Sequence, residues 1–425
     1  MTTDGKSIDL DALLAPLEAG RNVFLTGGAG TGKTTMTRQV IASFLSRSKK
    51  VAKLASTGMA ATLLGGQTLH SFFDLGIAEN ESDLERRGKL VPKKKIVRLV
   101  RAMDLIVIDE ISMVSAEVLD MVRLRLLQCG FKGAVLAVGD FLQLPPVSRR
   151  EVRFAFEAPS WKVLDFHIVT LTHNWRSEDA AFNAVLDAVR HARVGEHEHR
   201  YLHELIRPIG EDDLSRYTFL YGTNRSAHTH NRRQLERVEG DVFAYETQAV
   251  VHDESLSPRQ IERFYDEARI PKVLELKVGV PVLFTRNSWN YVNGERAVVT
   301  ALEEDAVFVR KNDGVVVKLE RADTEKTQWE EREVEGEKEQ VEVPKLTLSQ
   351  FPLTLAFAIT IHKSQGMSIS DLVIDTHEIF APSQFYVALS RAVSPKSLIL
   401  RCPKVNWVHL AFVHPKALAW YKNIS

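Results

Sequence analysis

The most informative stretch of the sequence is Gly27-Gly28-Ala29-Gly30-Thr31-Gly32-Lys33-Thr34. It has the spacing G-x-x-x-x-G-K-T, follows the apolar run Asn22–Thr26 and precedes a helical pattern. In this motif glycines allow backbone N–H groups to close around phosphates, and the lysine reaches the β- and γ-phosphate oxygens. The threonine hydroxyl at a helix N-terminus suits a magnesium ligand. The stretch therefore predicts a nucleotide-binding loop, with a ligand-free glycine-rich turn as the alternative.

Short apolar runs, each followed by turn residues and a helical pattern, recur through the first part of the chain. Such runs are typical of parallel strands that are buried on both faces, with the intervening helices as crossovers. This pattern predicts a doubly wound α/β domain. The expected strands are Asn22–Thr26, Val51–Ser56, Asp104–Asp109, Ala134–Gly139 and His167–Leu171.

A second set of strand-like runs, with a helical stretch around Ser383–Arg391, predicts a second α/β domain. More than a hundred residues separate its first strand from the later ones, which indicates an insertion. The expected strands are Tyr217–Tyr221, Leu353–Ile359, Asp371–Thr376 and Ser397–Cys402.

The insertion, roughly Val273–Thr347, alternates β-branched and polar residues between turn signals, which favours a small antiparallel barrel. Within it, Glu325–Glu342 holds eight glutamates and three basic residues. This run would repel a phosphate backbone, so we expect a solvated hairpin or loop.

Composition excludes several classes of protein. The chain has 425 residues, enough for two or three domains, and 44% of them are hydrophobic, as in globular proteins. Lysine plus arginine balances aspartate plus glutamate at 55 each, so any nucleic-acid site must be local. Cys129 and Cys402 cannot form a disulfide framework, and the sequence shows neither a secretory signal nor a membrane span. A cytoplasmic protein is expected.

Two polar motifs follow other expected strands. Asp109-Glu110 closes the run Leu105–Ile108, at the strand end where open α/β sheets bind ligands. Asp109 would hold magnesium and Glu110 would orient the attacking water. Gln143, in Gly139-Asp140-Phe141-Leu142-Gln143-Leu144-Pro145-Pro146, could contact the γ-phosphate or that water. An acidic turn and proline strand terminators are the alternatives.

These motifs, with Ile361-His362-Lys363-Ser364-Gln365-Gly366 and Tyr386-Val387-Ala388-Leu389-Ser390-Arg391, resemble in order those of superfamily 1B helicases. They are most similar to the Pif-type and phage Dda helicases. The resemblance implies two RecA-like P-loop NTPase domains with ATP between them, 5′→3′ translocation on single-stranded DNA, and unwinding of duplex or G-quadruplex DNA. It also implies roles in DNA repair and replication.

The resemblance sets the expected domain limits. The first RecA-like domain would span 1–170, with a short wedge insertion at about 74–102. The second would comprise 171–272 and 348–425, with an SH3-like barrel inserted at 273–347. The wedge contains a basic stretch, Lys93–Arg101, which is either a patch near the fork or a solvated helix face.

The resemblance also implies a set of nucleotide contacts. Arg176 and Arg391 match two arginines that reach the γ-phosphate from the second domain, where they would stabilise charge on the transferred phosphoryl group. The implied catalytic residues are Lys33, Glu110, Gln143, Arg176 and Arg391. The implied magnesium ligands are Thr34 and Asp109. Nucleotide binding would involve Gly28, Gly30, Thr31, Gly32, Lys33, Thr34, Thr35 and Gly366.

Several loops match the DNA-binding motifs of these helicases. Hydroxyls, glycines and backbone N–H groups at strand ends suit phosphate contacts without base preference. Phe72 could offer a stacking face, although packing in the core is a serious alternative. The implied DNA contacts are Thr57, Gly58, His70, Phe72, Asn224, Thr360, His362 and Lys363.

Two alternatives to a DNA helicase remain open. A nucleotide-switched nucleic-acid-binding ATPase, such as a loader or remodeller, would hydrolyse ATP without unwinding. Action on RNA is the other, because backbone contacts alone do not test for the 2′-OH. The expected partners are single-stranded, duplex or fork DNA, no membrane is expected, and the protein is expected to be a monomer.

Overall fold

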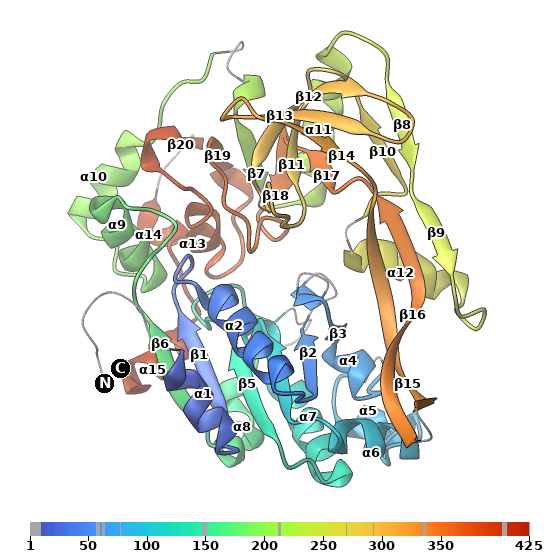
Figure 1. The fold of residues 1–425 in the computed structure, drawn as a ribbon. Helices are drawn as coiled ribbons and strands as arrows, with labels where there is room; N and C mark the ends of the chain where they lie inside the picture. The colour runs from blue at the N-terminus through green and yellow to red at the C-terminus, as the bar shows by residue number, and fades with distance from the viewer. Residues whose placement is uncertain are drawn as a thin grey trace.

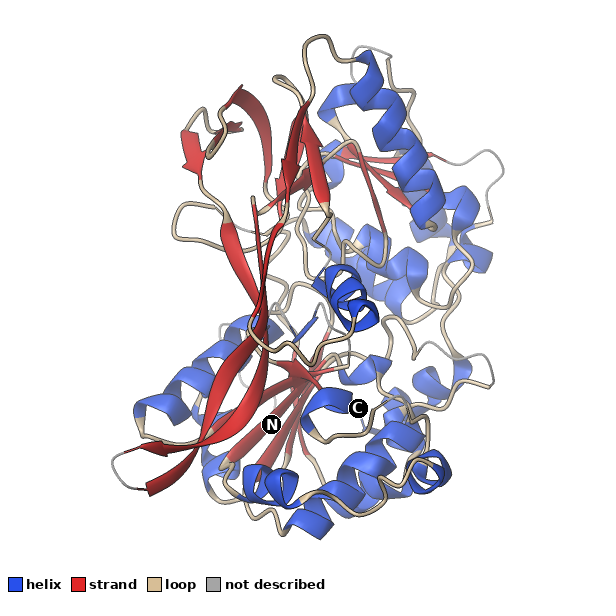
Figure 2. Cartoon of the chain, turned by 90° about the vertical axis from the view of Figure 1, so that its right-hand side faces the viewer, coloured by secondary structure: helices blue, strands red, loops and turns tan. Residues whose placement is uncertain are grey.

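The structure is a computed structural model of the chain. It describes residues 10–56, 60–61, 64–76, 78–146, 151–210, 214–268, 270–291, 293–334, 337–401 and 406–424. Two parallel sheets lie one above the other, and a long hairpin runs down one side of the molecule (Figures 1 and 2).

The lower domain is built on a six-stranded parallel sheet in the order β3-β2-β4-β5-β1-β6. Each expected strand of the first set is present, so the prediction of a first α/β domain is confirmed. The strands are β1 (Val23–Gly27), β2 (Val51–Ala55), β3 (Gln67–Thr68), β4 (Leu105–Asp109), β5 (Ala134–Val138) and β6 (His167–Leu171).

Helices cover both faces of this sheet, which explains why its inner strands β1, β4 and β5 are almost entirely apolar and buried. One face packs against α1 (Asp11–Glu18) and α2 (Lys33–Ser46). The other face packs against a larger set of helices and short 3-10 turns. That set comprises α4 (Leu69–Phe72), α5 (Glu81–Arg86), α6 (Lys94–Arg101), η1 (Ile111–Met113), α7 (Ala116–Cys129), η2 (Ala155–Glu157) and α8 (Pro159–Leu164).

The upper domain contains a four-stranded parallel sheet in the order β18-β7-β19-β20, which confirms a second α/β domain. Its strands are β7 (Thr218–Tyr221), β18 (Ala358–Thr360), β19 (Leu372–Asp375) and β20 (Leu398–Arg401). One face packs against α9 (Ala180–Arg190), α10 (Glu196–Glu204), α13 (Gln384–Leu389) and α14 (Trp407–Leu410). The helix α11 (Asn224–Arg237) lies against β7 and β18 on the other face. The 3-10 turns are η3 (Leu214–Arg216), η4 (Thr376–Glu378) and η5 (Pro395–Ser397).

A five-stranded antiparallel sheet, in the order β14-β13-β12-β11-β17, forms most of the insertion. Its strands are β11 (Pro281–Phe284), β12 (Arg296–Leu302), β13 (Val307–Lys311), β14 (Val316–Leu319) and β17 (Leu353–Leu355). The expected single strand Leu353–Ile359 is wrong, because it divides between β17 here and β18 in the parallel sheet. The division follows burial, since Phe351 and Leu353 pack in the insertion core while Ile359 packs in the second-domain core.

The glutamate-rich run forms a hairpin that leaves the five-stranded sheet. Its strands, β15 (Ala322–Val334) and β16 (Glu337–Gln350), pair along their whole length, and β9 (Gln248–Val251) adds a third strand. The hairpin reaches down to the lower domain (Figures 1 and 2), where Gln67 Nε2 lies 3.4 Å from Thr327 Oγ1. The remaining elements are β8 (Phe243–Glu246), β10 (Val273–Leu276) and α12 (Pro258–Ala268).

The end of the chain departs from the expected division. The helix α15 (Pro415–Ile424) leaves the upper domain and packs in the core of the lower one. There the Trp420 ring lies 5.8 Å from that of Phe24 and 5.1 Å from that of Phe141. Assigning all of 348–425 to the second domain was therefore wrong, because the apolar face of α15 completes the first-domain core.

Candidate nucleotide and nucleic-acid sites

The G-x-x-x-x-G-K-T loop lies between β1 and α2, as expected. Gly30 has φ +79°, and a Cβ there would lie 2.5 Å from Asn174 Oδ1, so the loop requires glycine at this position. Lys33 Nζ donates hydrogen bonds of 2.8 Å to the carbonyl oxygens of Gly27 and Gly28. The lysine is therefore held inside the curve of the loop, where phosphates bind in this motif.

Asp109 and Glu110 lie at the carboxyl end of β4, facing this loop across a cavity of about 790 Å³. Burial raises the pKa of Asp109, and burial together with the Asp109 charge raises that of Glu110 to about 7. Two carboxylates in so enclosed a place favour the entry of a cation. The P-loop cavity is lined by Gly30, Thr31, Gly32, Lys33, Thr34, Thr35, Asp109, Glu110, Gln143, Arg176, His362, Gly366 and Arg391, among others.

Two arginines of the later motifs line the opposite wall of the P-loop cavity. Arg176 Nε donates to Ser368 Oγ at 2.8 Å, and Arg391 Nη2 donates to Ser390 Oγ at 2.8 Å. Burial lowers the pKa of Arg176 to about 10, and burial with the neighbouring Arg176 charge lowers that of Arg391 to about 9. Within the described ranges neither guanidinium group forms an ion pair with a carboxylate, and two such groups held close together suit a multiply charged anion.

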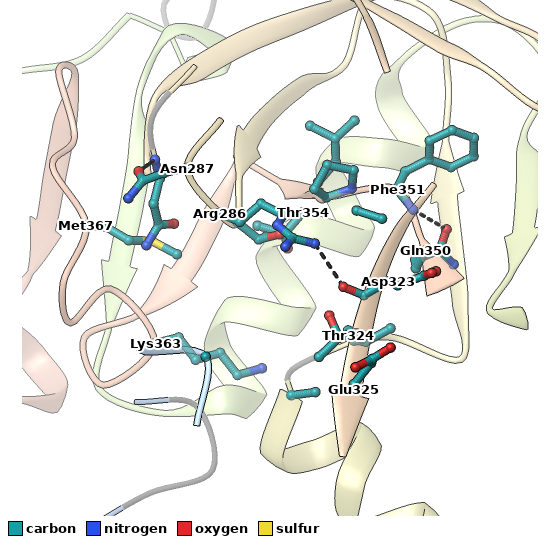
Figure 3. A pocket seen from close by; sticks show the side chains of 18 of the residues that line it. Arg286, Asn287, Asp323, Thr324, Glu325, Gln350, Phe351, Thr354, Lys363 and Met367 are labelled. Carbon is teal, nitrogen blue, oxygen red and sulfur yellow. Dashed lines mark hydrogen bonds between the residues drawn. The ribbon is translucent and has the colours of Figure 1, made fainter. Parts of the chain in front are cut away.

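A second cavity of about 790 Å³ lies between the two domains and the hairpin. Figure 3 shows Lys363 on one side and Asp323, Thr324 and Glu325 of β15 on the other. Arg286 Nη1 donates to the Asp323 carbonyl oxygen at 3.0 Å. We call this space the hairpin cavity; among the expected DNA contacts, Lys363 lines it.

The other expected DNA contacts are distributed differently. His362 lines the P-loop cavity, and Asn224 is exposed at the first turn of α11. Thr360 is buried, and its Oγ1 accepts a hydrogen bond of 3.2 Å from the Lys363 backbone N–H. Its side chain therefore shapes the loop beneath Lys363. Thr57 and Gly58 lie outside the described residues.

Two further expectations concern α4. Phe72 is 1% exposed and its ring packs edge-on against that of Phe73, so the idea of a stacking face for DNA was wrong. The ring packs in the core of the lower domain, in the same cluster as Ala52 and Leu54 of β2. His70 is half-buried, and burial lowers its pKa, with a smaller effect of the Arg263 charge on α12.

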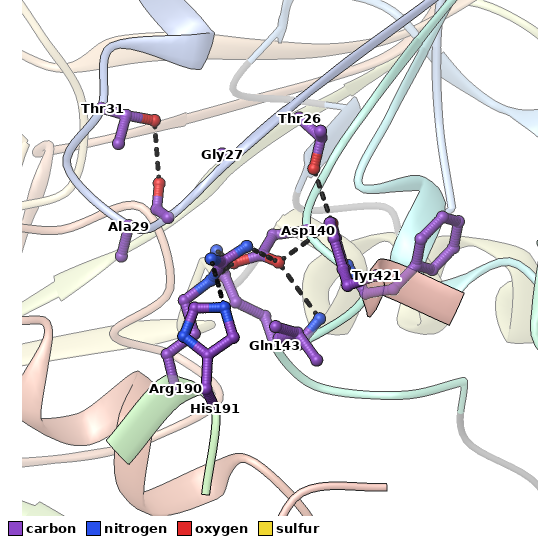
Figure 4. Close-up of polar contacts among 12 residues, drawn as sticks. Thr26, Gly27, Ala29, Thr31, Asp140, Gln143, Arg190, His191 and Tyr421 are labelled. Carbon is purple, nitrogen blue, oxygen red and sulfur yellow. Dashed lines mark hydrogen bonds and ion pairs between the residues drawn. The ribbon is translucent and has the colours of Figure 1, made fainter. Parts of the chain in front are cut away.

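A buried polar network that the sequence did not predict connects the domains beside the P-loop. Asp140 accepts hydrogen bonds from Arg190 at 2.8 and 3.0 Å, from Tyr421 Oη at 3.2 Å and from Gln143 Nε2 at 3.3 Å. Figure 4 shows these side chains converging on Asp140. Tyr386 Oη accepts a 2.8 Å hydrogen bond from the Ala29 N–H of the loop. No local pattern marks Arg190, whereas Tyr386 lies within a recognised motif.

Trp175 is another residue that sequence reasoning missed. Its backbone N–H donates to the Gly30 carbonyl oxygen at 2.8 Å, and its indole lies against Gly32 at the rim of the P-loop cavity. The side chain is 62% exposed, which is unusual for tryptophan. Its position directly before Arg176 in the sequence could have indicated that it lies at the same cavity.

The two parallel sheets, the phosphate-binding loop between them and the arginines facing it define a P-loop NTPase with two RecA-like domains. Residues 10–198 match the family model of the PIF1-like helicases. The ATP-dependent DNA helicase Pif1 of Bdellovibrio bacteriovorus is 39% identical over 96% of this chain and 90% of its own. The chain belongs to the PIF1-like helicase family.

Solved structures agree with this assignment. Pif1 from Bacteroides sp in complex with ADP-AlF4 superposes with a TM-score of 0.81 at 28% identity, covering 97% of this chain and 96% of that one. Bacteroides Pif1 bound to single-stranded DNA gives a TM-score of 0.64 at 28% identity, covering 99% and 97%. Among the described residues, no helix is long and apolar enough to cross a membrane.

Proposed function

We propose that this chain, an ATP-dependent DNA helicase by family, translocates 5′→3′ on single-stranded DNA and unwinds duplex or G-quadruplex DNA. One observation carries the proposal. Two carboxylates of the lower domain and two guanidinium groups of the upper domain face one cavity beside the phosphate-binding loop. Hydrolysis at such a site depends on how the two domains sit relative to each other.

The donor set of the P-loop cavity fits Mg²⁺ with ATP. Thr34, at the N-terminal turn of α2, and Asp109 would hold the ion, whose bound form neutralises charge on the β- and γ-phosphates. The buried carboxylates support this fit, because each has a raised pKa that a cation would lower. When a nucleotide binds, Lys33 Nζ would donate its hydrogen bonds to phosphate oxygens in place of the carbonyl oxygens of Gly27 and Gly28.

The remaining residues act on the attacking water and the transferred phosphoryl group. Glu110 would orient and polarise the water, and Gln143 would contact the water or the γ-phosphate. Arg176 and Arg391 would stabilise charge that spreads over the phosphoryl oxygens in the transition state. Trp175 offers a flat face at the cavity rim for the nucleotide base.

DNA would bind across both domains. Lys363 in the hairpin cavity, Asn224 at the start of α11 and the loop after β2 in the lower domain would hold phosphates of a single strand. Closure of the domains on ATP would bring these contacts together, and release would separate them, so that the strand advances. We place the wedge in α5–α6 and the SH3-like barrel in the five-stranded sheet. The protein would act as a cytoplasmic monomer.

Strand displacement tests this function. Duplexes with a 5′ or a 3′ single-stranded tail are incubated with ATP and Mg²⁺, and the Lys33→Ala variant is the control. Unwinding only from the 5′ tail, lost in Lys33→Ala, is the expected result. DNA-stimulated hydrolysis without unwinding from either tail would instead favour the nucleotide-switched binding protein. The same duplexes with single-stranded RNA tails test whether unwinding depends on the 2′-OH of the sugar.

A further inference from the structure

A third cavity, of about 520 Å³, lies on the outer face of the upper domain and takes no part in the sites described above. It is formed by α11, by β7 and by the end of β20. Tyr221 and His230 form part of its wall, with Tyr221 Oη 3.0 Å from His230 Nδ1. Four of the residues that line it are arginines: Arg225, Arg233, Arg237 and Arg401.

Three of these arginines lie on one ridge of α11. Arg225, Thr229, Arg233 and Arg237 follow one another at intervals of four residues, so they form a ridge that winds gradually around the helix. An α-helix rises about 1.5 Å per residue, so the row is about 18 Å long with steps of about 6 Å. We call these four residues the α11 stripe. A row of this length suits an extended anion better than a compact one.

The arginines of the stripe are exposed and uncompensated. Among the residues that the structure describes, Arg225, Arg233 and Arg237 make no ion pair and no hydrogen bond. Two nearby carboxylates contact other residues: Glu378 bonds Thr223 and Ser226, and Asp375 bonds His377 and lies 4.0 Å from Arg401 Nε. By contrast, Arg232 on another face of the helix pairs with Glu236 at 3.1 Å. The cavity therefore has a local positive field in a chain with no net charge.

The helix that carries the stripe is held firmly in place. Asn231 Nδ2 donates to the Ala358 carbonyl oxygen, and the Ala358 N–H donates to Asn231 Oδ1, each at 2.7 Å. Thr223 caps the N-terminus of α11 through the Ser226 N–H. The guanidinium groups thus project from a fixed support, which lowers the cost of ordering them around a ligand.

We propose that the α11 stripe binds the phosphodiester backbone of single-stranded DNA. Guanidinium groups bind phosphate oxygens in a bidentate manner, and the hydroxyl of Thr229 supplies an uncharged donor of the kind usual at phosphate contacts. The row begins one residue after Asn224, so it continues the DNA path of the proposed function, on which this inference rests. The strand bound is either the one being tracked or the one displaced.

The test compares an Arg225→Gln/Arg233→Gln/Arg237→Gln variant with the wild type and with Arg232→Gln on the same helix. Affinity is measured against salt for oligothymidylates of about 8 and about 30 nucleotides, and for a fork with two such tails. Loss of three phosphate contacts lowers the salt slope by about 2, and the affinity by about tenfold or more. Arg232→Gln should match the wild type, as should DNA-free ATP hydrolysis in both variants.

Each outcome is decisive. A lower slope on the long oligonucleotide assigns the stripe to the tracked strand, and a loss confined to the fork assigns it to the displaced strand; both support the proposal. An unchanged slope on every DNA, with the wild type binding and unwinding normally, overturns it. Polyglutamate is tested as a model acidic peptide. If the triple variant loses binding to polyglutamate while its binding to every DNA is unchanged, the proposal is overturned in favour of an acidic peptide. Failure of the wild type itself to bind DNA would instead refute the proposed function.

Discussion

Arg190 of the upper domain forms an enclosed ion pair with Asp140 of the lower domain, with Nη2 2.8 Å from Oδ1. The Asp140 side chain is fully buried and that of Arg190 is 13% exposed. Asp140 also bonds Gln143, which lines the P-loop cavity. The pair thus connects the position of the domains to a residue beside the proposed γ-phosphate site.

Breaking this pair should destabilise the protein. Arg190→Met leaves the Asp140 charge buried without a partner, which typically costs about 3–5 kcal/mol in the free energy of unfolding. Adding Asp140→Asn removes that charge. The loss in the free energy of unfolding of the double variant should therefore be about 2 kcal/mol smaller than the sum of the losses in the two single variants. Urea unfolding of the four proteins measures this. Strict additivity would show that the two residues do not interact.

Glu110→Gln should abolish most hydrolysis while leaving the nucleotide bound. The amide cannot accept a proton from water, so we expect DNA-stimulated phosphate release to fall by about 100-fold or more. Glu117→Gln, on α7 outside the P-loop cavity, is the matched control. An unchanged rate in Glu110→Gln would contradict the assigned role.

Trp175 should contribute to nucleotide affinity. Loss of a stacking face typically costs about 1–3 kcal/mol, so Trp175→Ala should weaken ATP binding by about tenfold. Trp175→Phe should retain most of the affinity. Trp289, which is 94% exposed and outside the P-loop cavity, provides the control Trp289→Ala. Equal dissociation constants for Trp175→Ala and the wild type would exclude the contact.

His230 should make stability depend on pH below neutrality. Burial, followed by the surrounding charges, lowers its pKa from 6.5 to about 4. Between these values the unfolded chain binds more protons than the folded one, so stability is complete above about pH 6.5 and falls as the pH drops toward 4. Because the ring is partly exposed, we expect a loss of about 1–2 kcal/mol. The groups that face the ring are Arg401, Arg237, Arg233, Asp375 and Tyr221.

Denaturant unfolding at several pH values tests this expectation. His230→Asn removes the titrating ring, so its stability should decline less than that of the wild type between pH 6.5 and 4. His228→Asn, an exposed neighbour on α11 with no ring contact of this kind, is the control. Parallel curves for the wild type and His230→Asn would show that the ring does not titrate in this range.

The sequence predicted the two parallel sheets because their strands are buried on both faces and therefore read as apolar runs. It also predicted which residues would surround the P-loop cavity, since the carboxyl ends of neighbouring strands meet at one edge of a sheet. Lys33, Asp109 and Gln143 come together for that reason, although their chemical roles remain predictions.

Other features depend on partners far away in the sequence. The β15–β16 hairpin is rich in glutamate and has no simple apolar alternation, so pairing between its strands, more than burial, determines its structure. Phe72 lies in a matched motif, yet tertiary packing decides that its ring is buried. Arg190 and Tyr421 meet Asp140 from positions 50 and 281 residues away, which no local pattern reveals.

The return of α15 to the lower domain means that the backbone passes between the domains twice. One passage lies between β6 and α9, and the other between α14 and α15. Two connecting segments between a pair of domains define an axis about which one domain can rotate relative to the other. The upper domain is therefore expected to move relative to the lower one mainly by rotation about the line through these two crossings.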